Sequence, residues 1–424
     1  MTLKIGNQDF IPVVFAADIN VYSLARAYHE AYGIRIKAYG TALSGPLHYT
    51  CIADYDAHQD TDNPKVLRSL LQDFAADHPA QKILPIGCGD NYVQAIAIAA
   101  EEGLPENVCQ HYMKHSDLLR YAHKQNFYAL CDQEKIAHPK TFVYSESFGG
   151  RIDIDFQPPF IVKPSDGVSW WRHPFENQRK VHIVSSVAEL KTLLSAVYAA
   201  KYDGEVIVQE YIDGPDSDLY VLTQYIDSRG VLTLSASGRV LAEEHTPKGV
   251  GNSVVIVSEP HGKQIKDTAR QLGDLLLKNG YRGFASFDLK YDQRQDCLKV
   301  LEVNTRQGRG NYYVTGSGAN IARFITEDLV YQRAIEPVLE VEPYIWSVLP
   351  EAYTRRCVGD ADNLLHHTGL NLMGAGRWGN PLDYKADKSL MRQLWLKRYE
   401  RLQVSHYEAW KKLEDNNSCE QASS

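Results

Sequence analysis

Two acidic residues and an asparagine mark the part of the sequence where chemistry is most readily expected. Asp288 lies in FASFDLKY, whereas Glu302 and Asn304 lie in LEVN, after a short turn. Side chains alternate between the two faces of a strand, so a hairpin that buries Phe287 against Val303 gathers the three polar groups on its other face. Carboxylate and amide oxygens suit Mg²⁺, which typically also takes oxygens from nucleotide phosphates. The pattern therefore predicts a magnesium site.

The same alternation predicts the face on which each remaining residue of the second strand lies. It places Leu301 on the apolar face with Val303, and it places Val300 on the polar face. The segment TRQGRG follows directly and brings Arg306 and Arg309 beside the carboxylates. Such cations suit a phosphate or a substrate carboxylate held across the metal. An ion-pair network without any ligand is the competing interpretation.

The N-terminal part of the sequence alternates apolar runs with amphipathic stretches. FIPVVFAA and KILPIG are predicted to be buried strands, and the helical pattern after each stops at Gly33 or Gly103. This alternation predicts a parallel sheet, whose ligands lie beyond the carboxyl ends of the strands. Residues 18–20 and 87–91 are therefore candidate substrate loops, although turns and helix caps are their alternative role. Cys88 is expected to be a small buried residue rather than a nucleophile.

From about residue 116 the pattern changes to strands with interspersed helices, which is typical of an α+β region. Residues 116–135 are predicted to form a helix with Ser116 as its N-cap. At 424 residues the chain exceeds the size of one hydrophobic core. We expect an N-terminal α/β domain, two α+β subdomains and a helical C-terminal extension, with the limits 1–115, 116–200, 201–330 and 331–424.

Composition excludes several classes of protein. A net charge of −8 argues against nucleic acid as the main partner. No apolar run is long enough to span a bilayer, and no secretory signal is visible. Seven scattered cysteines without a CxxC pair indicate a reduced, cytoplasmic protein. The helix predicted over 391–414 carries aromatic residues among Lys and Arg, which leaves peripheral membrane contact open. Packing against its own domain is the expected role, and the oligomeric state is left open.

Taken in order along the chain, these motifs resemble the ATP-grasp superfamily. LEVNTRQGR is similar to the E-x-N-x-R metal strand of that superfamily, and FASFDLKY is similar to the strand with its other metal-binding aspartate. The resemblance implies an ATP-grasp fold, of mixed α/β and α+β class, behind an N-terminal Rossmann-like parallel-sheet domain. It also implies ATP and Mg²⁺ as cofactors, with the metal on Asp288, Glu302 and Asn304.

The resemblance assigns further residues by their position in the motifs. Lys124 and Lys163 match the two lysines that contact the nucleotide phosphates. The stretch VIVQEYIDGPD resembles the strand that binds adenine through its backbone and the ribose through an acid. The residues concerned are Gln209, Glu210, Tyr211 and Ile212 for adenine, and Asp216 for the ribose. In the reaction that this fold implies, Arg306 is the candidate for stabilising the transferring phosphoryl group and the tetrahedral intermediate, and Arg309 is the candidate for binding a substrate carboxylate.

Two departures from the superfamily pattern are visible. The loop after Lys163 holds only one glycine, Gly167, where many members are glycine-rich. Phosphate contacts would then come from cations of this loop, namely Arg172, Arg179 or Lys180. Ser286 stands where some dipeptide-forming members carry an arginine, which argues against the D-alanine–D-alanine ligase branch.

A closer resemblance, over nearly the whole chain, is to bacterial D-aspartate ligases. It rests on FIPVVFAADINVYSLARAYHEAYG, GCGDNYV, VIVQEYIDGPDSDLYVL, TPKGVGNSVVIV and EVNTRQGRGNYYVTGSGANIARFITED. It implies that D-aspartate is the small amino-acid substrate and that its acceptor is a lysine side chain in a peptidoglycan precursor. Ligation of another amino acid or acceptor is the nearest alternative, and a non-catalytic nucleotide-binding protein is the next. His245 is a candidate for the base that deprotonates the amine.

Overall fold

The structure is a computed structural model of the chain. It describes residues 4–165, 167–244, 249, 251–258, 262–359 and 363–421.

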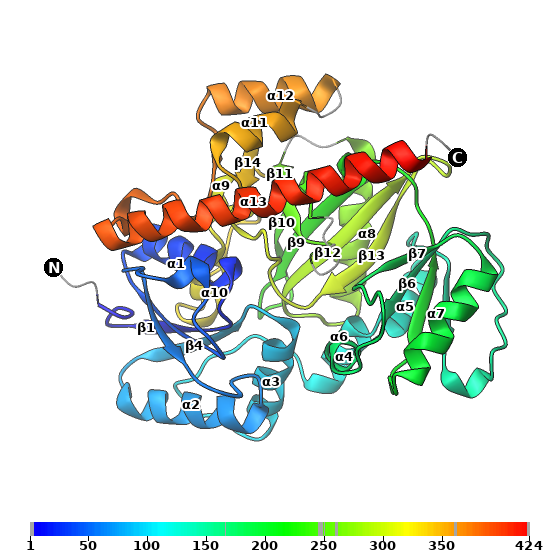
Figure 1. Ribbon diagram of the computed structural model, residues 1–424. Helices are drawn as coiled ribbons and strands as arrows, with labels where there is room; N and C mark the ends of the chain where they lie inside the picture. The colour runs from blue at the N-terminus through cyan, green and yellow to red at the C-terminus, as the bar shows by residue number, and fades with distance from the viewer. Residues whose placement is uncertain are drawn as a thin grey trace.

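An N-terminal parallel sheet carries the first set of loops. Its strands run in the order β3-β2-β1-β4, and β1 pairs in parallel with both β2 and β4, as the alternation predicts. Helices α1 and α10 lie on one face, while α2 and α3 lie on the other (Figure 1). The strands are β1 Phe10–Phe15, β2 Ile36–Gly40, β3 Ala53–Ala57 and β4 Lys82–Gly87. The helices are α1 Ile19–Tyr32, α2 Pro64–Asp77, α3 Asp90–Glu101 and α10 Ile321–Leu329.

A second, antiparallel sheet has the order β5-β8-β6-β7. Helix α7 (Val187–Ala199) packs on it through Leu190, Leu194 and Val197. Its strands are β5 Thr141–Tyr144, β6 Phe160–Pro164, β7 His182–Val184 and β8 Val206–Glu210, with α6 Gly167–Arg172 between β6 and β7. Strand β8 begins after the domain limit expected at residue 200, and the domain limits stay a prediction.

Two helices precede this sheet where one was expected. The chain forms α4 (His115–Ala122) and α5 (Lys124–Gln133), and His123 between them has extended backbone angles of φ −83° and ψ 117°. The prediction of one helix capped by Ser116 is therefore wrong, because Lys114 holds the cap position and the extended backbone of His123 ends the first helix at Ala122. The break places Lys124 in the first turn of α5.

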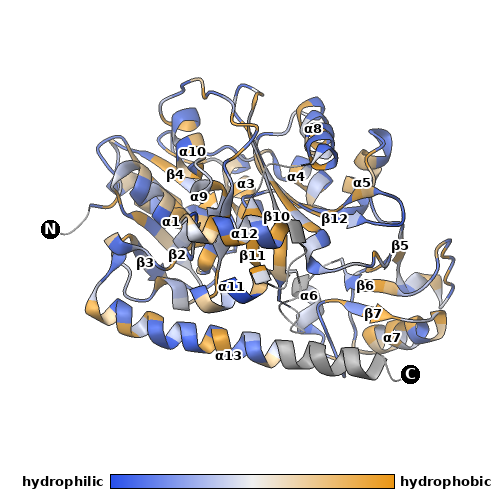
Figure 2. Ribbon diagram, turned by 90° about the horizontal axis from the view of Figure 1, so that it is seen from above, coloured by the Kyte–Doolittle hydropathy of each residue, from blue (hydrophilic) through white to orange (hydrophobic). Residues whose placement is uncertain are grey.

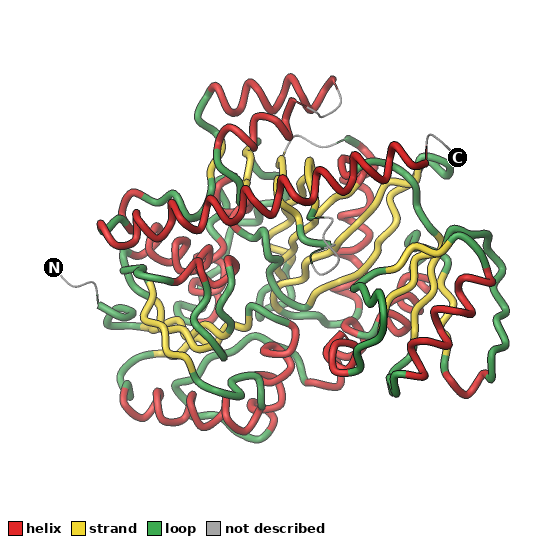
Figure 3. Tube along the Cα trace, viewed as in Figure 1, coloured by secondary structure: helices red, strands yellow, loops and turns green. Residues whose placement is uncertain are grey.

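The third sheet has seven strands in the order β13-β12-β9-β10-β11-β14-β15, and Figure 3 shows it through the centre of the molecule. One face packs against α5 and α8, with Phe287, Leu289 and Leu276 in the core between them. The strands are β9 Leu219–Ile226, β10 Leu232–Glu243, β11 Ser253–Ser258, β12 Gly283–Asp292, β13 Cys297–Asn304, β14 Tyr344–Ser347 and β15 Trp378–Gly379. The helices are α8 Lys263–Lys278 and α9 Tyr312–Gly316.

The C-terminal part adds three helices and the last two strands at one side of the third sheet, β14 and the edge strand β15. The long helix α13 runs along the outside of the molecule, from the N-terminal sheet past the seven-stranded sheet (Figures 1 and 2). Among the described residues, no helix is long and apolar enough to cross a membrane. The helices are α11 Glu351–Gly359, α12 Asn363–Gly374 and α13 Leu390–Gln421.

A buried ion pair in this C-terminal part makes hydrogen bonds to the N-terminal domain. Arg392 and Asp387 are both almost fully buried, and their charged atoms are 2.6 Å apart. The Asp387 carboxylate also accepts hydrogen bonds from the Tyr22 hydroxyl at 2.7 Å and the Cys51 amide at 2.7 Å. Arg392 donates to the His48 carbonyl at 2.6 Å. The helix α13 is thus packed on its own chain, as expected.

Asp387→Ala is expected to lower the free energy of unfolding by about 3–5 kcal/mol, because it leaves Arg392 charged and unpaired inside the protein. Urea unfolding measures the loss. Asp383→Ala is the matched control, since Asp383 is 74% exposed and pairs with Lys388 at the surface; its cost is expected to stay below about 1 kcal/mol. Equal urea midpoints for the two variants would contradict the prediction.

Candidate active site

The hairpin of β12 and β13 has the register that alternation predicts around its acids. Asp288 lies directly opposite Glu302, and Ser286 lies opposite Asn304. Phe287 lies opposite Val303, and both are buried in the core beneath the sheet. The hairpin therefore presents both carboxylates and the amide on the face away from that core.

A β-bulge changes the neighbouring residues. Asp288 pairs with Glu302 but Leu289 pairs with Val300, so Leu301 is the extra residue. Val300 consequently lies in the apolar core, and Leu301 is half-buried outside it. The faces expected for Leu301 and Val300 were therefore wrong. The Leu301 carbonyl, left out of the ladder, accepts a hydrogen bond from the Tyr128 hydroxyl at 2.5 Å.

Lys124 provides the first cation of the site. Its Nζ lies 2.8 Å from a Glu302 carboxylate oxygen. The positive charge of Lys124 holds the pKa of Glu302 well below its usual range, so this carboxylate is ionised at any working pH. Burial and the charge of Glu302 raise the pKa of the facing Asp288 well above its usual range. Two carboxylates forced together in this way are the arrangement that a divalent cation relieves.

Arg306 joins this group to the N-terminal sheet. Its guanidinium faces Asp90 in the first turn of α3, with an Nη2 to Oδ2 hydrogen bond of 3.0 Å and an Nε to Oδ1 distance of 3.0 Å. The same Nη2 donates to the Asn304 side-chain oxygen at 3.2 Å. The Asn304 amide nitrogen in turn donates to Asp288 at 3.4 Å. A chain of contacts thus runs from the loop after β4 to the acids of the hairpin.

The two candidate substrate loops meet the segment that follows β13. The Asn20 side-chain amide donates to the carbonyls of Cys88 at 3.3 Å and Gln307 at 3.4 Å. Cys88 is buried, as expected, and burial raises the pKa of its thiol far above the ordinary value. Asp18 caps α1 by accepting from the Asn20 backbone amide at 3.0 Å, so the helix-cap role also holds at this position.

Arg309 lies at the outer end of this segment. It donates to the Ser253 carbonyl at 3.2 Å, at the start of β11. Burial raises the pKa of Asp18, and the charge of Arg309 opposes that rise. The same charge acts on Tyr399 of α13, which places Arg309 among the N-terminal sheet, β11 and the C-terminal helix.

Lys163 is the second lysine of the site, on β6. Burial and the nearby charge of Lys124 lower its pKa to about 7, and Glu302 and Asp288 partly offset that effect. Of the loop cations, Lys180 acts electrostatically on both Lys163 and Glu302. The second sheet and the hairpin thus share one electrostatic site. The candidate base His245 lies outside the described residues.

The strand expected to bind adenine is β8 and its continuation. The Gln209 side chain is buried and donates to the Tyr128 hydroxyl at 2.9 Å. The Glu210 backbone amide donates to the Lys140 carbonyl at 3.0 Å, and the Glu210 carboxylate pairs with Lys299. Tyr211 and Ile212 follow the strand, and the Tyr211 carbonyl accepts from Arg294 at 3.2 Å. The side chains of Gln209 and Glu210 therefore hold the strand in place.

Asp216 and Glu243 lie beside the hairpin. An Asp216 carboxylate oxygen accepts from the Glu243 backbone amide at 2.8 Å, and the charge of Glu243 contributes to the raised pKa of Asp288. Sequence reasoning missed Glu243, Lys299 and the contact of Asp90. The acidic pair in LAEEH at the end of a strand was the available signal for Glu243; no local pattern pointed to the other two.

The donor set of the hairpin fits a hard divalent ion. Asp288 and Glu302 supply facing carboxylates, and the Asn304 side-chain amide lies beside Asp288 with its oxygen on Arg306. In the described part of the chain, no group of three or more His, Cys, Asp or Glu residues has metal-binding geometry. The predicted set contains only two such residues, Asp288 and Glu302, because Asn304 is not counted. It is therefore compatible with the absence of a larger group among the described residues.

Comparisons with known proteins add to this geometry. No family model matches the chain. The chain is 31% identical over 412 residues to D-aspartate ligase of Enterococcus faecium (strain Aus0004), which covers 94% of this chain and 96% of that protein.

Two solved structures show the same architecture. The L-amino acid ligase of Bacillus licheniformis matches with a TM-score of 0.53 at 14% identity, covering 78% of this chain and 76% of that one. The biotin carboxylase domain of Hydrogenobacter thermophilus 2-oxoglutarate carboxylase, solved with MgADP, ADP and bicarbonate, matches with a TM-score of 0.60 at 14% identity. The match covers 80% of this chain and 74% of that one.

The fold and the relatives together define an ATP-dependent carboxylate–amine ligase of the ATP-grasp class. The predicted ATP-grasp fold behind a parallel N-terminal sheet, with a helical C-terminal region, is confirmed. With 31% identity along nearly the full length of both chains, the protein belongs to the D-aspartate ligase family.

Proposed function

We propose that the protein joins the β-carboxylate of D-aspartate to the lysine side-chain amine of a peptidoglycan precursor, with conversion of ATP to ADP and phosphate. The observation that carries the proposal is the site itself. Asp288 faces Glu302 across the hairpin, Lys124 pairs with Glu302, and Arg306 lies at the same face. The similarity to D-aspartate ligase supports the choice of substrates.

The reaction has two balanced steps. A β-carboxylate oxygen of D-aspartate bonds to the γ-phosphorus of ATP, and the bond from that phosphorus to ADP breaks. The lysine nitrogen then bonds to the acyl carbon of the resulting acyl phosphate, inorganic phosphate leaves, and the amine gives up a proton. The first step is phosphoryl transfer, in which positioning and neutralisation of charge do most of the catalytic work.

Each binding and catalytic role in this reaction can be assigned to described residues. Asp288, Glu302 and Asn304 would hold Mg²⁺, which supplies charge neutralisation on phosphate oxygens when bound. Lys124 and Lys163 would bind nucleotide phosphates, and the proximity of both to Glu302 supports this assignment. We assign adenine to the backbone of residues 209–212 and the ribose to Asp216.

The two arginines take the remaining roles. Arg306 would stabilise the transferring phosphoryl group, and Arg309 would bind a substrate carboxylate. ATP and a UDP-linked precursor are cytoplasmic reactants, so we place the reaction in the cytoplasm.

The lowered pKa of Lys163 predicts a pH dependence for nucleotide binding. Without nucleotide, Lys163 loses its proton as the pH rises through about 7. Bound phosphates favour the charged form, so binding at pH 8.5 must take up a proton, and affinity should fall roughly tenfold between pH 7 and 8.5. Calorimetry in buffers of different ionisation enthalpy measures this uptake. Lys163→Met should abolish the uptake; the same uptake in that variant would contradict the assignment.

Mass spectrometry of the products tests the proposed reaction. The protein is incubated with ATP, Mg²⁺, D-aspartate and a UDP-linked pentapeptide that contains lysine. The expected product is heavier than the acceptor by one aspartyl residue, and L-aspartate or an acceptor with an acetylated lysine should give none. Release of ADP with another acid or acceptor would reject these substrates and leave the ligase class standing.

A further inference from the structure

Helix α13 exposes large apolar side chains on its outward face. Leu390, Met391, Leu394 and Leu402 have exposed fractions of 74%, 53%, 57% and 50%. Residues four and eight positions apart share one side of a helix, so these side chains form a stripe. Figures 1 and 2 both show α13 along the outer side of the molecule. The stripe therefore has no partner in the described part of the chain.

The turn beneath the start of α13 extends the stripe. Trp395 donates its indole hydrogen to the Gly45 carbonyl at 2.9 Å, and its ring centre lies 6.3 Å from that of Tyr49. Tyr49 and Leu43, on either side of this turn, are 52% and 43% exposed. Six of the thirteen large apolar side chains exposed in the described chain thus gather here. We call them the α13 patch: Leu43, Tyr49, Leu390, Met391, Leu394 and Leu402.

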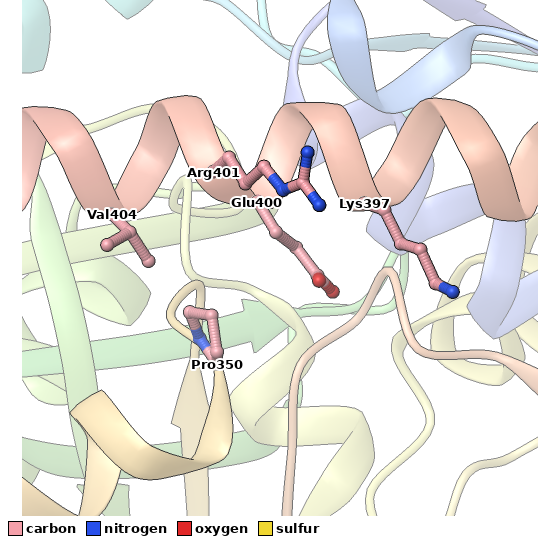
Figure 4. A pocket seen from close by; sticks show the side chains of 5 residues that line it. All are labelled: Pro350, Lys397, Glu400, Arg401 and Val404. Atoms are coloured by element: carbon pink, nitrogen blue, oxygen red, sulfur yellow. The ribbon is translucent and has the colours of Figure 1, made fainter.

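Between Leu390 and Trp410, where the structure describes the side chains of α13, positive charges predominate among the exposed ones. Lys397, Arg398 and Arg401 are exposed between Leu394 and Leu402, whereas the side chain of Glu408, further along the helix, is 39% exposed. Glu408 pairs with Arg356 at 3.7 Å. Glu400 is half-buried and lines a pocket together with Pro350, Lys397 and Arg401 (Figure 4). A cationic, apolar surface thus lies on a chain whose net charge is −8.

We infer that the α13 patch docks on an anionic lipid surface. Apolar side chains of an amphipathic helix enter the headgroup region, and Lys and Arg beside them bind lipid phosphates. Tyrosine and tryptophan prefer this boundary because each has an apolar ring and a polar end. The inference goes beyond the proposed ligase reaction, since it concerns a face that the site residues do not form.

Charge favours lipid over a second copy of the chain as the occupant. A two-fold pairing would bring the same surface of both copies together. Lys397, Arg398 and Arg401 of one copy would then approach the same cations of the other, and Glu400, the acid among them, is half-buried. An anionic surface instead complements all three cations.

Co-sedimentation of the full chain with vesicles tests the inference. We expect binding to vesicles of phosphatidylglycerol and phosphatidylcholine, loss of binding in high salt, and little binding to phosphatidylcholine alone. A Lys397→Gln and Arg401→Gln double variant should bind roughly 25-fold more weakly, because each cation strengthens binding about fivefold. A Leu394→Gln and Leu402→Gln double variant should lose at least about tenfold.

Leu339→Gln is the matched control, because Leu339 is 54% exposed but lies outside the α13 patch. It should bind as the unchanged protein does, and thermal melting checks that every variant is folded. Three results would overturn the inference: no binding of the unchanged protein to anionic vesicles, full binding by the Leu394 and Leu402 double variant, or a dimer in sedimentation velocity that this double variant converts to a monomer. The last result would assign the patch to a second copy.

Discussion

Glu302→Gln is expected to reduce turnover at least about a thousandfold while the fold stays intact. Glutamine keeps the shape of the side chain but removes the charge that pairs with Lys124 and faces Asp288. Because Lys124 keeps the pKa of Glu302 low, the native carboxylate is a fully charged ligand for a metal ion. Release of ADP, measured against Mg²⁺ concentration, should show both the loss and a higher Mg²⁺ requirement.

Asp296→Asn is the matched control for this substitution. Asp296 lies in the turn of the same hairpin, where it accepts hydrogen bonds from Tyr291 and Gln264. Turnover of this variant should stay within about twofold of the unchanged protein, since surface substitutions have small effects. A Glu302→Gln protein that kept more than a tenth of normal turnover would reject the metal-site assignment.

Arg306→Ala is expected to lower kcat by about 10²–10³ and to change the KM for ATP much less. This pattern distinguishes an interaction made in the transition state from uniform binding. The structure holds the guanidinium between Asp90 and the Asn304 oxygen, so its position does not depend on substrate. Steady-state kinetics with each substrate varied in turn measures the separate effects on kcat and on each KM.

Two further variants make the Arg306 result specific. Asp90→Asn keeps the arginine but weakens its support, so kcat should fall only about tenfold. Arg333→Ala removes a surface arginine that pairs with Glu327 and should change neither constant. If Arg306→Ala raised only the KM for the amino acid, Arg306 would instead be the group that binds a substrate carboxylate.

Local periodicity was sufficient to predict how the residues of the hairpin pair around Asp288. Buried and polar residues alternate through both strands of the hairpin, and that alternation places Asp288 opposite Glu302. It failed at Leu301, because a bulge shifts the register by one residue. At the bulge, the Leu301 carbonyl accepts a hydrogen bond from Tyr128, which is 173 positions away in the sequence. A short-range pattern carries no information about such a distant partner.

The supporting contacts were beyond sequence reasoning for the same reason. Asp90 and Arg306 are 216 positions apart and meet only because the N-terminal sheet packs beside the hairpin. Glu210 and Lys299 likewise come from different sheets. The break at His123 was missed because residues 116–135 have a helical composition throughout, so nothing in that stretch distinguishes one helix from two.

The buried pair of Asp387 and Arg392 has a consequence for synthesis on the ribosome. Asp387 supplies the acceptor for groups on Tyr22, Thr50 and Cys51, which emerge from the ribosome more than 330 residues earlier. At about 5–20 residues per second, these groups wait on the order of half a minute for their partner. The first domain to be translated is therefore among the last to be completed, and chaperones that shield nascent chains would meet its unfinished surface throughout that delay.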